Sequence, residues 1–525
     1  MSAGAILSEH TVTERQKSWA SLALLWGLLL VLAGLRPLAV PDEGRYGDIG
    51  RWMLQSGDWI IPRLDGIPFF HKPPLLHWLN ASLMALFGVH TWVVRLGPAL
   101  HAGLMLVVMY LVLRRLPALP GRDSEHLARR AIWVLGSSLA FLIGGQYVNH
   151  DMLVACWIGV AIWAFAMAFL QSSGQAPDLW LARAGFVACG LGVLSKGLIG
   201  LVLPGLVLFL WLFQTRQWRK VPRLPWISGV ALFSVIAVPW FVLAERRAPG
   251  LLAYLFGDQQ FNRYTATTFN NGRPWWFYLA GLFLLMFPWT FLVLPQVLTW
   301  LRRRSLPGPQ GLGPWVSLAW IWLVAIIGFF SVPHSKLIGY ALPVMPPLAF
   351  LAALGFEQTL AHRPHAGRYF GGLLVVALLV ACGVEWAAAR YTERRGSADV
   401  ASALACQMSP GDTVLAAGDF PYDLPFVARL PQAMVVIQDW ALQRREAGDN
   451  WRRELFEGAD FDRQAGQVLQ GQDTLVQASR LPGQWLVAPR GFEVKNFDLV
   501  LEGRAWVLYR SPTTVAGSGL PSCRR

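Results

Sequence analysis

Charged residues are scarce in this chain of 525 residues. Only 14% of its residues are Asp, Glu, Lys or Arg, whereas 54% are hydrophobic and the mean hydropathy is +0.41. A soluble domain carries roughly 25% charged residues. The composition therefore excludes a disordered chain, a coiled coil and an ordinary soluble enzyme. It indicates an integral membrane protein.

Cysteine is also rare, and the five residues match neither a metal site nor a disulfide framework. Three of them lie in apolar runs, so only Cys406 and Cys523 could pair outside the membrane. The spacing of five candidate histidines fits no known zinc-ligand pattern; these are His71, His77, His90, His101 and His150. We therefore expect no metal centre; a divalent metal held by His71 and a carboxylate is the alternative. The sequence shows no internal repeat, nucleotide-binding motif or cleavable signal pattern.

The net charge of +14 is concentrated in the hydrophobic part of the chain. Residues 1–390 carry 30 Lys and Arg against 15 Asp and Glu, while residues 391–525 carry 15 against 16. Short basic loops set the orientation of membrane proteins. We therefore expect this excess to mark cytoplasmic loops, and we expect no nucleic-acid partner.

Apolar stretches of spanning length recur through residues 1–390. Eleven are counted, and splitting or merging those broken by proline changes this count by up to two; we predict about 11–13 transmembrane helices. They lie near 19–40, 91–113, 131–147, 151–170, 180–195, 198–213, 226–244, 275–299, 314–331, 337–356 and 369–390. Arginine clusters alternate between loops, which predicts an inner N-terminus and an outer, periplasmic location for residues 391–525.

Residues 391–525 are predicted to form a small α/β domain. Short β-rich runs occur at 413–417, 433–438, 484–488 and 499–509, and helical patterns occur at 439–455 and 462–479. The membrane part is expected to carry its chemistry on the outer loops 41–90 and 245–274, where acids and bases are mixed.

Three acidic residues are candidates for catalysis. Asp42 and Glu43 directly follow the first apolar run, and Asp151 opens a later one on the same predicted side. Carboxylates at the membrane edge are costly unless they are paired or functional, and Asp42 could act as a general base. The alternative for Asp42 and Asp151 is a structural role, because an Asp before a helix is a common cap.

Four cations on or near the outer side complete a candidate site. Lys72, Lys196, Arg263 and Lys336 could together stabilise the charge of a phosphate leaving group. The alternative is that single cations near the interface extend toward water or contact lipid phosphates.

These segments resemble one family. The blocks are Asp42–Tyr46, Ser56–Trp59, Phe70–Pro74, the turn at Asp151, Leu194–Gly197, Asn262–Tyr264, Arg273–Tyr278 and Ser335–Pro343. In this order and spacing they are similar to lipid A aminoarabinose transferases of the ArnT type. Those belong to the polytopic, polyprenyl-phosphate-dependent GT-C glycosyltransferases, together with protein O-mannosyltransferases.

The resemblance implies residue roles. Asp42 matches the main catalytic carboxylate and Asp151 the second acid, and Glu43 is taken as part of this group. Lys72 and Arg263 match residues that hold the lipid phosphate, with Arg45 and Tyr46 flanking them and Lys196 and Lys336 added as further cations. His71 stands where family members often have Glu, which puts any metal or sugar contact of that Glu in doubt here.

The implied reaction is inverting transfer of a sugar, such as 4-amino-4-deoxy-L-arabinose, from undecaprenyl phosphate to lipid A or a related glycolipid. We expect a monomer in the bacterial inner membrane, in contact with membrane lipids. Two alternatives stay open: a protein O-glycosyltransferase of the same fold, and a polyprenyl-lipid transporter. A transporter should show repeat symmetry and acids at mid-membrane depth, and neither is evident.

Overall fold

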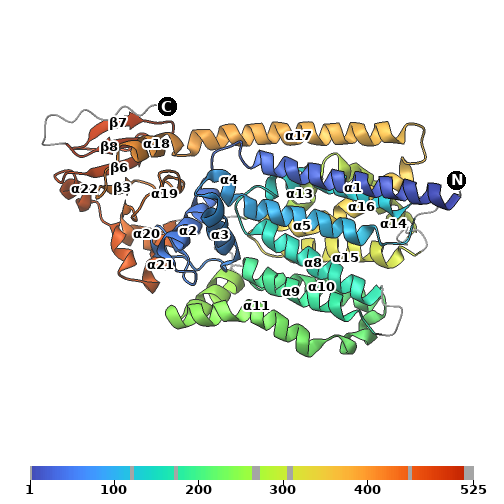
Figure 1. Ribbon diagram of the computed structural model, residues 1–525. Coiled ribbons are helices and arrows are strands. Elements are labelled where there is room, and N and C mark those ends of the chain that lie inside the picture. The colour runs from blue at the N-terminus through green and yellow to red at the C-terminus, as the bar shows by residue number, and fades with distance from the viewer. Residues whose placement is uncertain are drawn as a thin grey trace.

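The computed structural model describes residues 3–118, 123–170, 176–262, 272–303, 311–446 and 452–512. These residues form a bundle of long helices with a smaller domain of strands and short helices at one end (Figure 1). The predicted combination of a polytopic helical part and a C-terminal α/β domain is confirmed.

Long apolar helices joined by short segments make up the bundle. Their bounds are α1 (Ala3–Leu32), α5 (Leu96–Leu113), α6 (Ser124–Gly136), α7 (Leu139–Gly144), α8 (Asp151–Leu170), α9 (Leu179–Lys196), α10 (Ile199–Gln214), η1 (Gln217–Arg223), α11 (Trp226–Arg247), η2 (Ala253–Asn262), α13 (Phe277–Leu285), η3 (Trp289–Leu292), α14 (Leu294–Arg303), α15 (Gly313–Ser331), η4 (Ile338–Val344), α16 (Met345–Thr359) and α17 (Ala366–Arg395). Helices satisfy their backbone hydrogen bonds internally, as a hydrocarbon environment requires.

Seven helices in the described part of the chain are long and apolar enough to cross a membrane, or eight if a bent pair is one span. The expected span at 131–147 is divided between α6 and α7, and the one at 198–213 is the shorter helix α10. The expected span at 275–299 bends by 104° between Leu285 and Trp289. Pro288 lies in this break, where its ring and missing N–H interrupt helical geometry.

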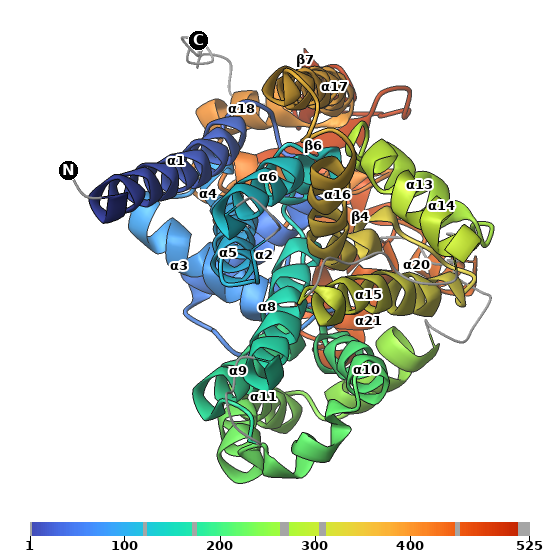
Figure 2. The ribbon, with the colours of Figure 1, turned by 90° about the vertical axis from the view of Figure 1, so that its right-hand side faces the viewer.

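Helices α8 and α16 lie inside the bundle and α17 at its edge (Figure 2). Buried residues make up 78% of the apolar window of α8 and only 11% of that of α17. The expected domain boundary at residue 390 falls inside α17, which continues to Arg395. The division into domains 1–390 and 391–525 stays a prediction.

The outer loop 41–90 is largely folded into short elements. They are α2 (Asp42–Ser56), β1 (Arg63–Leu64), β2 (Ile67–Pro68) and α3 (Leu75–Phe87), followed by α4 (Thr91–Val94). Strands β1 and β2 form an antiparallel hairpin. Both faces of α2 are buried, including the polar face with Arg45, Asp48 and Arg51.

The C-terminal domain is built on a mixed sheet. Its elements are α18 (Ala398–Gln407), β3 (Thr413–Ala417), α19 (Leu424–Val427), β4 (Val435–Ile437), α20 (Trp440–Glu446), α21 (Arg452–Phe461), η5 (Ala465–Val468), β5 (Leu469–Gln470), α22 (Asp473–Ala478), β6 (Gln484–Pro489), β7 (Asp498–Glu502) and β8 (Trp506–Arg510). The strand order in the described residues is β5-β4-β3-β6-β8-β7. The first four strands are parallel, and β8 and β7 are antiparallel additions.

The outer loop and the C-terminal domain share one hydrophobic core. Ile49 and Phe69 of the loop pack in the same buried cluster as Leu455 and Trp485 of the domain. At Gly44, an added Cβ would lie 2.7 Å from backbone atoms of Tyr422 and Asp423. Such overlap shows that the two backbones approach as closely as a residue without a side chain allows. The C-terminal domain is therefore docked directly on the loop that carries Asp42.

Candidate active site

Asp42 is the first residue of α2, and its carboxylate is held by two donors. Arg45 Nη2 donates to Oδ1 at 2.5 Å, and the Tyr147 hydroxyl donates to Oδ2 at 3.1 Å. The residue capping α2 is Pro41, and no side-chain cap bond is formed there. The side chain of Asp42 is 23% exposed. Asp42 therefore contacts Arg45 of its own helix and the Tyr147 hydroxyl of a distant segment, and it does not cap α2.

The surroundings of Asp42 favour a carboxylate that binds protons more tightly than usual. Burial raises its pKa, although Arg45 and the Tyr147 hydroxyl oppose this rise. The negative charges of Glu454 and Asp151 raise the pKa further. Burial and like charges both disfavour the ionised form of a carboxyl group. A raised pKa suits a group that accepts a proton near neutral pH.

Asp151 begins α8 and forms an ion pair with Lys196 at the end of α9. Asn149 accepts the N–H of Asp151 at 2.9 Å, so Asn149 satisfies the start of this helix. The Lys196 ammonium also lies 4.5 Å from the centre of the Tyr340 ring, a cation–π distance. An added Cβ at Gly339 would overlap the Asp151 carboxylate. The acid, the cation and the segment η4 are therefore in close contact.

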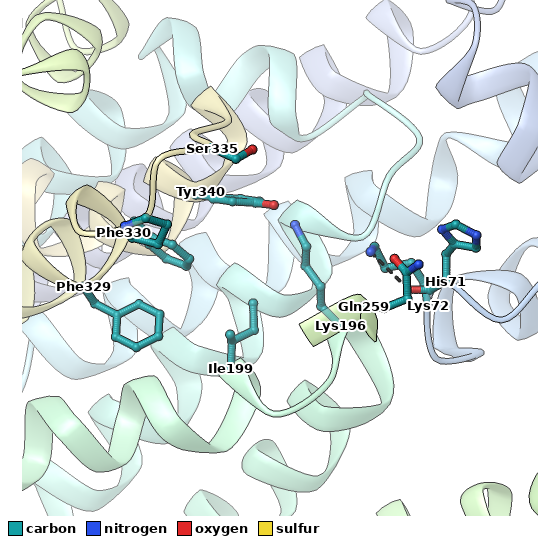
Figure 3. Close-up of a pocket in the computed structure, with 10 residues that line it drawn as sticks. His71, Lys72, Lys196, Ile199, Gln259, Phe329, Phe330, Ser335 and Tyr340 are labelled. Atoms are coloured by element: carbon teal, nitrogen blue, oxygen red, sulfur yellow. Dashed lines mark hydrogen bonds between the residues drawn. The ribbon is translucent and has the colours of Figure 1, made fainter. Parts of the chain in front are cut away.

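A cavity of about 110 Å³ lies beside this ion pair. Its lining includes His71, Lys72, Lys196, Ile199, Gln259, Phe329, Phe330, Pro333, Ser335 and Tyr340. Figure 3 shows Lys196 in the middle, with Tyr340 and Ser335 on one side and Lys72, His71 and Gln259 on the other. Two ammonium groups and apolar rings in one cavity can receive an anionic head group attached to an apolar chain.

The predicted cations differ in their placement. Lys72 and Lys196 line the cavity. Lys336 is 4% exposed, and its Nζ donates to the carbonyl oxygens of Pro333 and Arg273 at 2.6 and 3.1 Å. This ammonium therefore stabilises its own loop. Arg263 lies outside the described residues, so its predicted role in phosphate binding stays a prediction.

Glu43 lies next to Asp42 in the sequence but has a different environment. It is fully buried and pairs with Arg36 and Arg95 at 2.5 and 2.8 Å. Burial opposes its ionisation, but Arg95 and Arg36 hold its pKa at about 2. A carboxylate enclosed by two guanidinium groups is a poor proton acceptor. These contacts favour a structural role over the catalytic role expected from the sequence.

Arg45 and Tyr46 are not among the residues that line the cavity. Arg45 is 3% exposed and bonds to Asp42, to Glu454 and, at 3.1 Å, to the Tyr46 hydroxyl. Tyr46 packs against the rings of His150 and Phe69. The Arg45 guanidinium therefore pairs with carboxylates of the protein, whereas the family resemblance suggested that it lies beside the lipid phosphate.

Sequence reasoning missed the acids that the C-terminal domain contributes. Glu454 on α21 pairs with Arg45, and Glu457 accepts the Tyr254 hydroxyl at 2.6 Å. His71 lies between them, with Nδ1 3.9 Å from Glu454 and Nε2 3.5 Å from Glu457. In the part of the chain that the structure describes, no group of three or more His, Cys, Asp or Glu side chains is arranged to hold a metal ion. Glu454 and its partner Arg45 are 409 positions apart in the sequence. No local sequence motif could therefore indicate that α21 contributes to the site.

Comparisons with known proteins place this arrangement in a family. The family model for dolichyl-phosphate-mannose-protein mannosyltransferases matches residues 17–255. An undecaprenyl phosphate-alpha-4-amino-4-deoxy-L-arabinose arabinosyl transferase of Pseudomonas aeruginosa is 31% identical over 369 residues, which are 69% of this chain and 64% of that protein. A transferase of the same name from Sodalis glossinidius is 30% identical over 456 residues, or 83% of this chain and 73% of that protein.

A solved structure agrees over nearly the whole length. The crystal structure of ArnT from Cupriavidus metallidurans bound to undecaprenyl phosphate superposes with a TM-score of 0.76 at 24% identity, covering 96% of this chain and 98% of the other. This likeness confirms the predicted GT-C-type fold. The relatives in sequence show that the chain belongs to the family of ArnT-type undecaprenyl phosphate-aminoarabinose arabinosyl transferases.

Proposed function

We propose that this protein transfers an amino sugar, such as 4-amino-4-deoxy-L-arabinose, from undecaprenyl phosphate to lipid A or a related glycolipid. The observation that carries the proposal is the cavity lined by Lys72 and Lys196, which adjoins Asp151 and lies near Asp42. Cations stabilise the charge that develops on a departing phosphate. The names of the sequence relatives and the lipid bound to the structural relative support this donor.

The chemistry is an inverting displacement. An acceptor oxygen forms a bond to the anomeric carbon while the bond from that carbon to the phosphate oxygen breaks, and undecaprenyl phosphate leaves with the electron pair. If the acceptor is a hydroxyl, Asp42 takes its proton. If the acceptor is an ionised phosphate of lipid A, no proton is transferred, and Asp42 orients the acceptor or the cationic amino sugar.

The proposed orientation places the site and the C-terminal domain in the periplasm. The connection between α10 and α11, which contains the basic segment η1, lies at the end of the bundle remote from that domain (Figure 1). Basic segments favour the cytoplasmic side. In addition, Cys406 of α18 is disulfide-bonded, and disulfides persist in oxidising compartments such as the periplasm. The other predicted partner, Cys523, lies outside the described residues.

Mass spectrometry of lipid A from Gram-negative cells with and without this protein tests the proposal. We expect a species heavier by one amino-sugar residue only when the protein is present, and the added mass identifies the sugar. The family-model name includes protein mannosyltransferases, so glycopeptides from the same cells are measured in parallel. If the sugar were found on peptides while lipid A stayed unchanged, the acceptor would be a protein and not a glycolipid.

A further inference from the structure

Helix α21 of the C-terminal domain lies directly against the hairpin of the outer loop. An added Cβ at Gly458 would lie 2.1 Å from the carbonyl oxygen of Pro68 in β2. Leu455, one turn before Gly458, is fully buried in the core that the loop and the domain share. This close packing fixes the position of the neighbouring turn, which carries Glu454.

Glu454 occupies a costly position for a carboxylate. Its side chain is 10% exposed, and one oxygen pairs with Arg45. The other oxygen, Oε2, is buried and has no hydrogen-bond partner within the described residues. A buried charge is unfavourable unless it is paired and hydrogen-bonded. An uncharged side chain would pack here at a lower energetic cost, so packing alone does not explain a carboxylate at position 454.

Arg45 contacts both Glu454 and Asp42. The same guanidinium binds Asp42 through Nη2 and Glu454 through Nη1. We propose that Glu454 is a positioning residue for Asp42: by sharing Arg45, it fixes the guanidinium between two carboxylates and keeps Asp42 available to the acceptor. The C-terminal domain thereby completes the catalytic centre of the membrane domain. This inference rests on the proposed function of Asp42.

The electrostatic consequence has a definite sign. Burial has the largest effect on the pKa of Asp42 and raises it. Arg45 lowers this pKa, and the negative charge of Glu454 raises it. Removing the charge of Glu454 takes away one of the influences that raise the pKa of Asp42, so this pKa falls. The charged or titratable groups around this pair include Arg45 and Tyr46 of α2, His71 of the outer loop, Tyr147 before α8, Asp151 at the start of α8, Glu454 of α21, and Tyr422.

The test uses the full-length protein in vesicles with an undecaprenyl phosphate-linked amino sugar and a lipid A hydroxyl acceptor. For Glu454→Gln we expect kcat to fall by roughly tenfold or more, KM for the donor to stay unchanged, and the acidic limb of the rate profile to move to lower pH. Glu454→Asp should recover part of the rate, because it keeps the charge. Asp460→Asn is the matched control, since this acid of α21 pairs with Arg444 at the exposed surface.

A double-mutant cycle separates positioning from a structural effect. Adding Glu454→Gln to Asp42→Asn should cause no further loss, because the group that Glu454 positions is already absent. An equal further loss in that background would overturn the inference, as would wild-type kcat in Glu454→Gln. Thermal unfolding of each variant checks the fold. If the unmodified protein transfers no sugar, the proposed function fails and this inference fails with it; if it transfers sugar and Glu454→Gln does so equally, the inference alone fails.

Discussion

At the residue scale, the carboxylates of the site differ in the cations with which they pair. Asp42 shares Arg45 with Glu454, Asp151 pairs with Lys196, and Glu43 is enclosed by two arginines. Asp42 has a raised pKa and a partly exposed side chain, whereas Glu43 is fully buried and its pKa is held at about 2. These differences favour Asp42 over Glu43 as the acid that takes part in the proposed reaction.

Replacing Asp42 with Asn should reduce sugar transfer by about 10²–10⁴-fold, the usual contribution of a positioned proton acceptor. The substitution is isosteric, and Tyr147 can still donate to the amide oxygen, so binding of undecaprenyl phosphate should be retained. Transfer is measured by lipid A mass spectrometry, with Asp498→Asn as a control in an exposed strand residue. A normal rate in a well-expressed Asp42→Asn protein would remove Asp42 from the reaction.

Replacing Lys72 with Ala should weaken binding of undecaprenyl phosphate. A hydrogen bond to a charged group contributes about 1.5–3 kcal/mol, which corresponds to roughly a tenfold to hundredfold increase in Kd. Binding is measured with the purified protein, and Lys495→Ala, an exposed lysine of the C-terminal domain, is the control. Equal affinity of Lys72→Ala and the control would show that Lys72 does not bind the phosphate.

The sequence predicted some site residues and missed others for a physical reason. Asp42, Asp151, Lys72 and Lys196 could be found because acids and cations beside apolar runs are conspicuous. Their pairings could not, because Tyr147 reaches Asp42 across 105 positions and Glu454 reaches Arg45 across 409. Such contacts depend on how the helices and the C-terminal domain pack, and no local pattern carries that information.

At the element scale, the short helix α2 joins the two parts of the molecule. Its apolar face packs in the shared core, and its polar face is covered by the C-terminal domain. The sequence alone does not show that the polar face of α2 is buried, because the residues that cover it belong to a distant domain.

Gly44→Ala should destabilise the docking of α2. The new methyl group would overlap backbone atoms of Tyr422 and Asp423, which cannot move as a flexible side chain can. We expect a lower Tm and reduced sugar transfer. Gly371→Ala in α17 is the matched control, because a Cβ there meets nothing within 4 Å and Ala is the better helix former. Equal Tm values for the two variants would contradict the close contact at Gly44.

The hairpin contributes a pH-dependent contact through Asp65. This residue is fully buried, and its Oδ1 accepts the N–H of Met434 at 2.9 Å. Burial raises the pKa of Asp65 to about 8, although the Met434 N–H opposes the rise. The unfolded value is about 3.9, so between these values the folded protein binds more protons. The free energy of unfolding therefore falls as the pH rises from about 4 to about 8.

Asp65→Asn should remove this dependence, because Asn does not titrate and its oxygen can still accept the Met434 N–H. We expect the variant to have a higher Tm than the unmodified protein at pH 8, with a smaller difference at pH 5. Thermal unfolding at the two pH values measures this. A difference that is equal at both pH values, or larger at pH 5, would show that Asp65 is not the responsible group.

At the scale of the whole molecule, the charge of the chain divides between its two ends. The basic segment η1 lies at the end remote from the C-terminal domain, whereas Asp42 and Asp151 pair with cations near that domain, beside the cavity (Figure 1). Composition and apolar runs are enough to predict this division and the membrane-embedded fold. The breaks in α6–α7 and near Pro288 alter the count of spanning helices, because hydropathy does not show where a helix bends.

The central claim is that the outer end of this bundle transfers a sugar from undecaprenyl phosphate with inversion. The most direct measurement uses the purified protein in vesicles with a donor of known anomeric configuration and lipid A as the acceptor. Product structure is read by NMR and mass spectrometry. We expect one undecaprenyl phosphate to be released per sugar transferred, the opposite anomeric configuration in the product, and a strong loss of transfer in Asp42→Asn. Retained configuration, or undiminished transfer by Asp42→Asn, would contradict the claim.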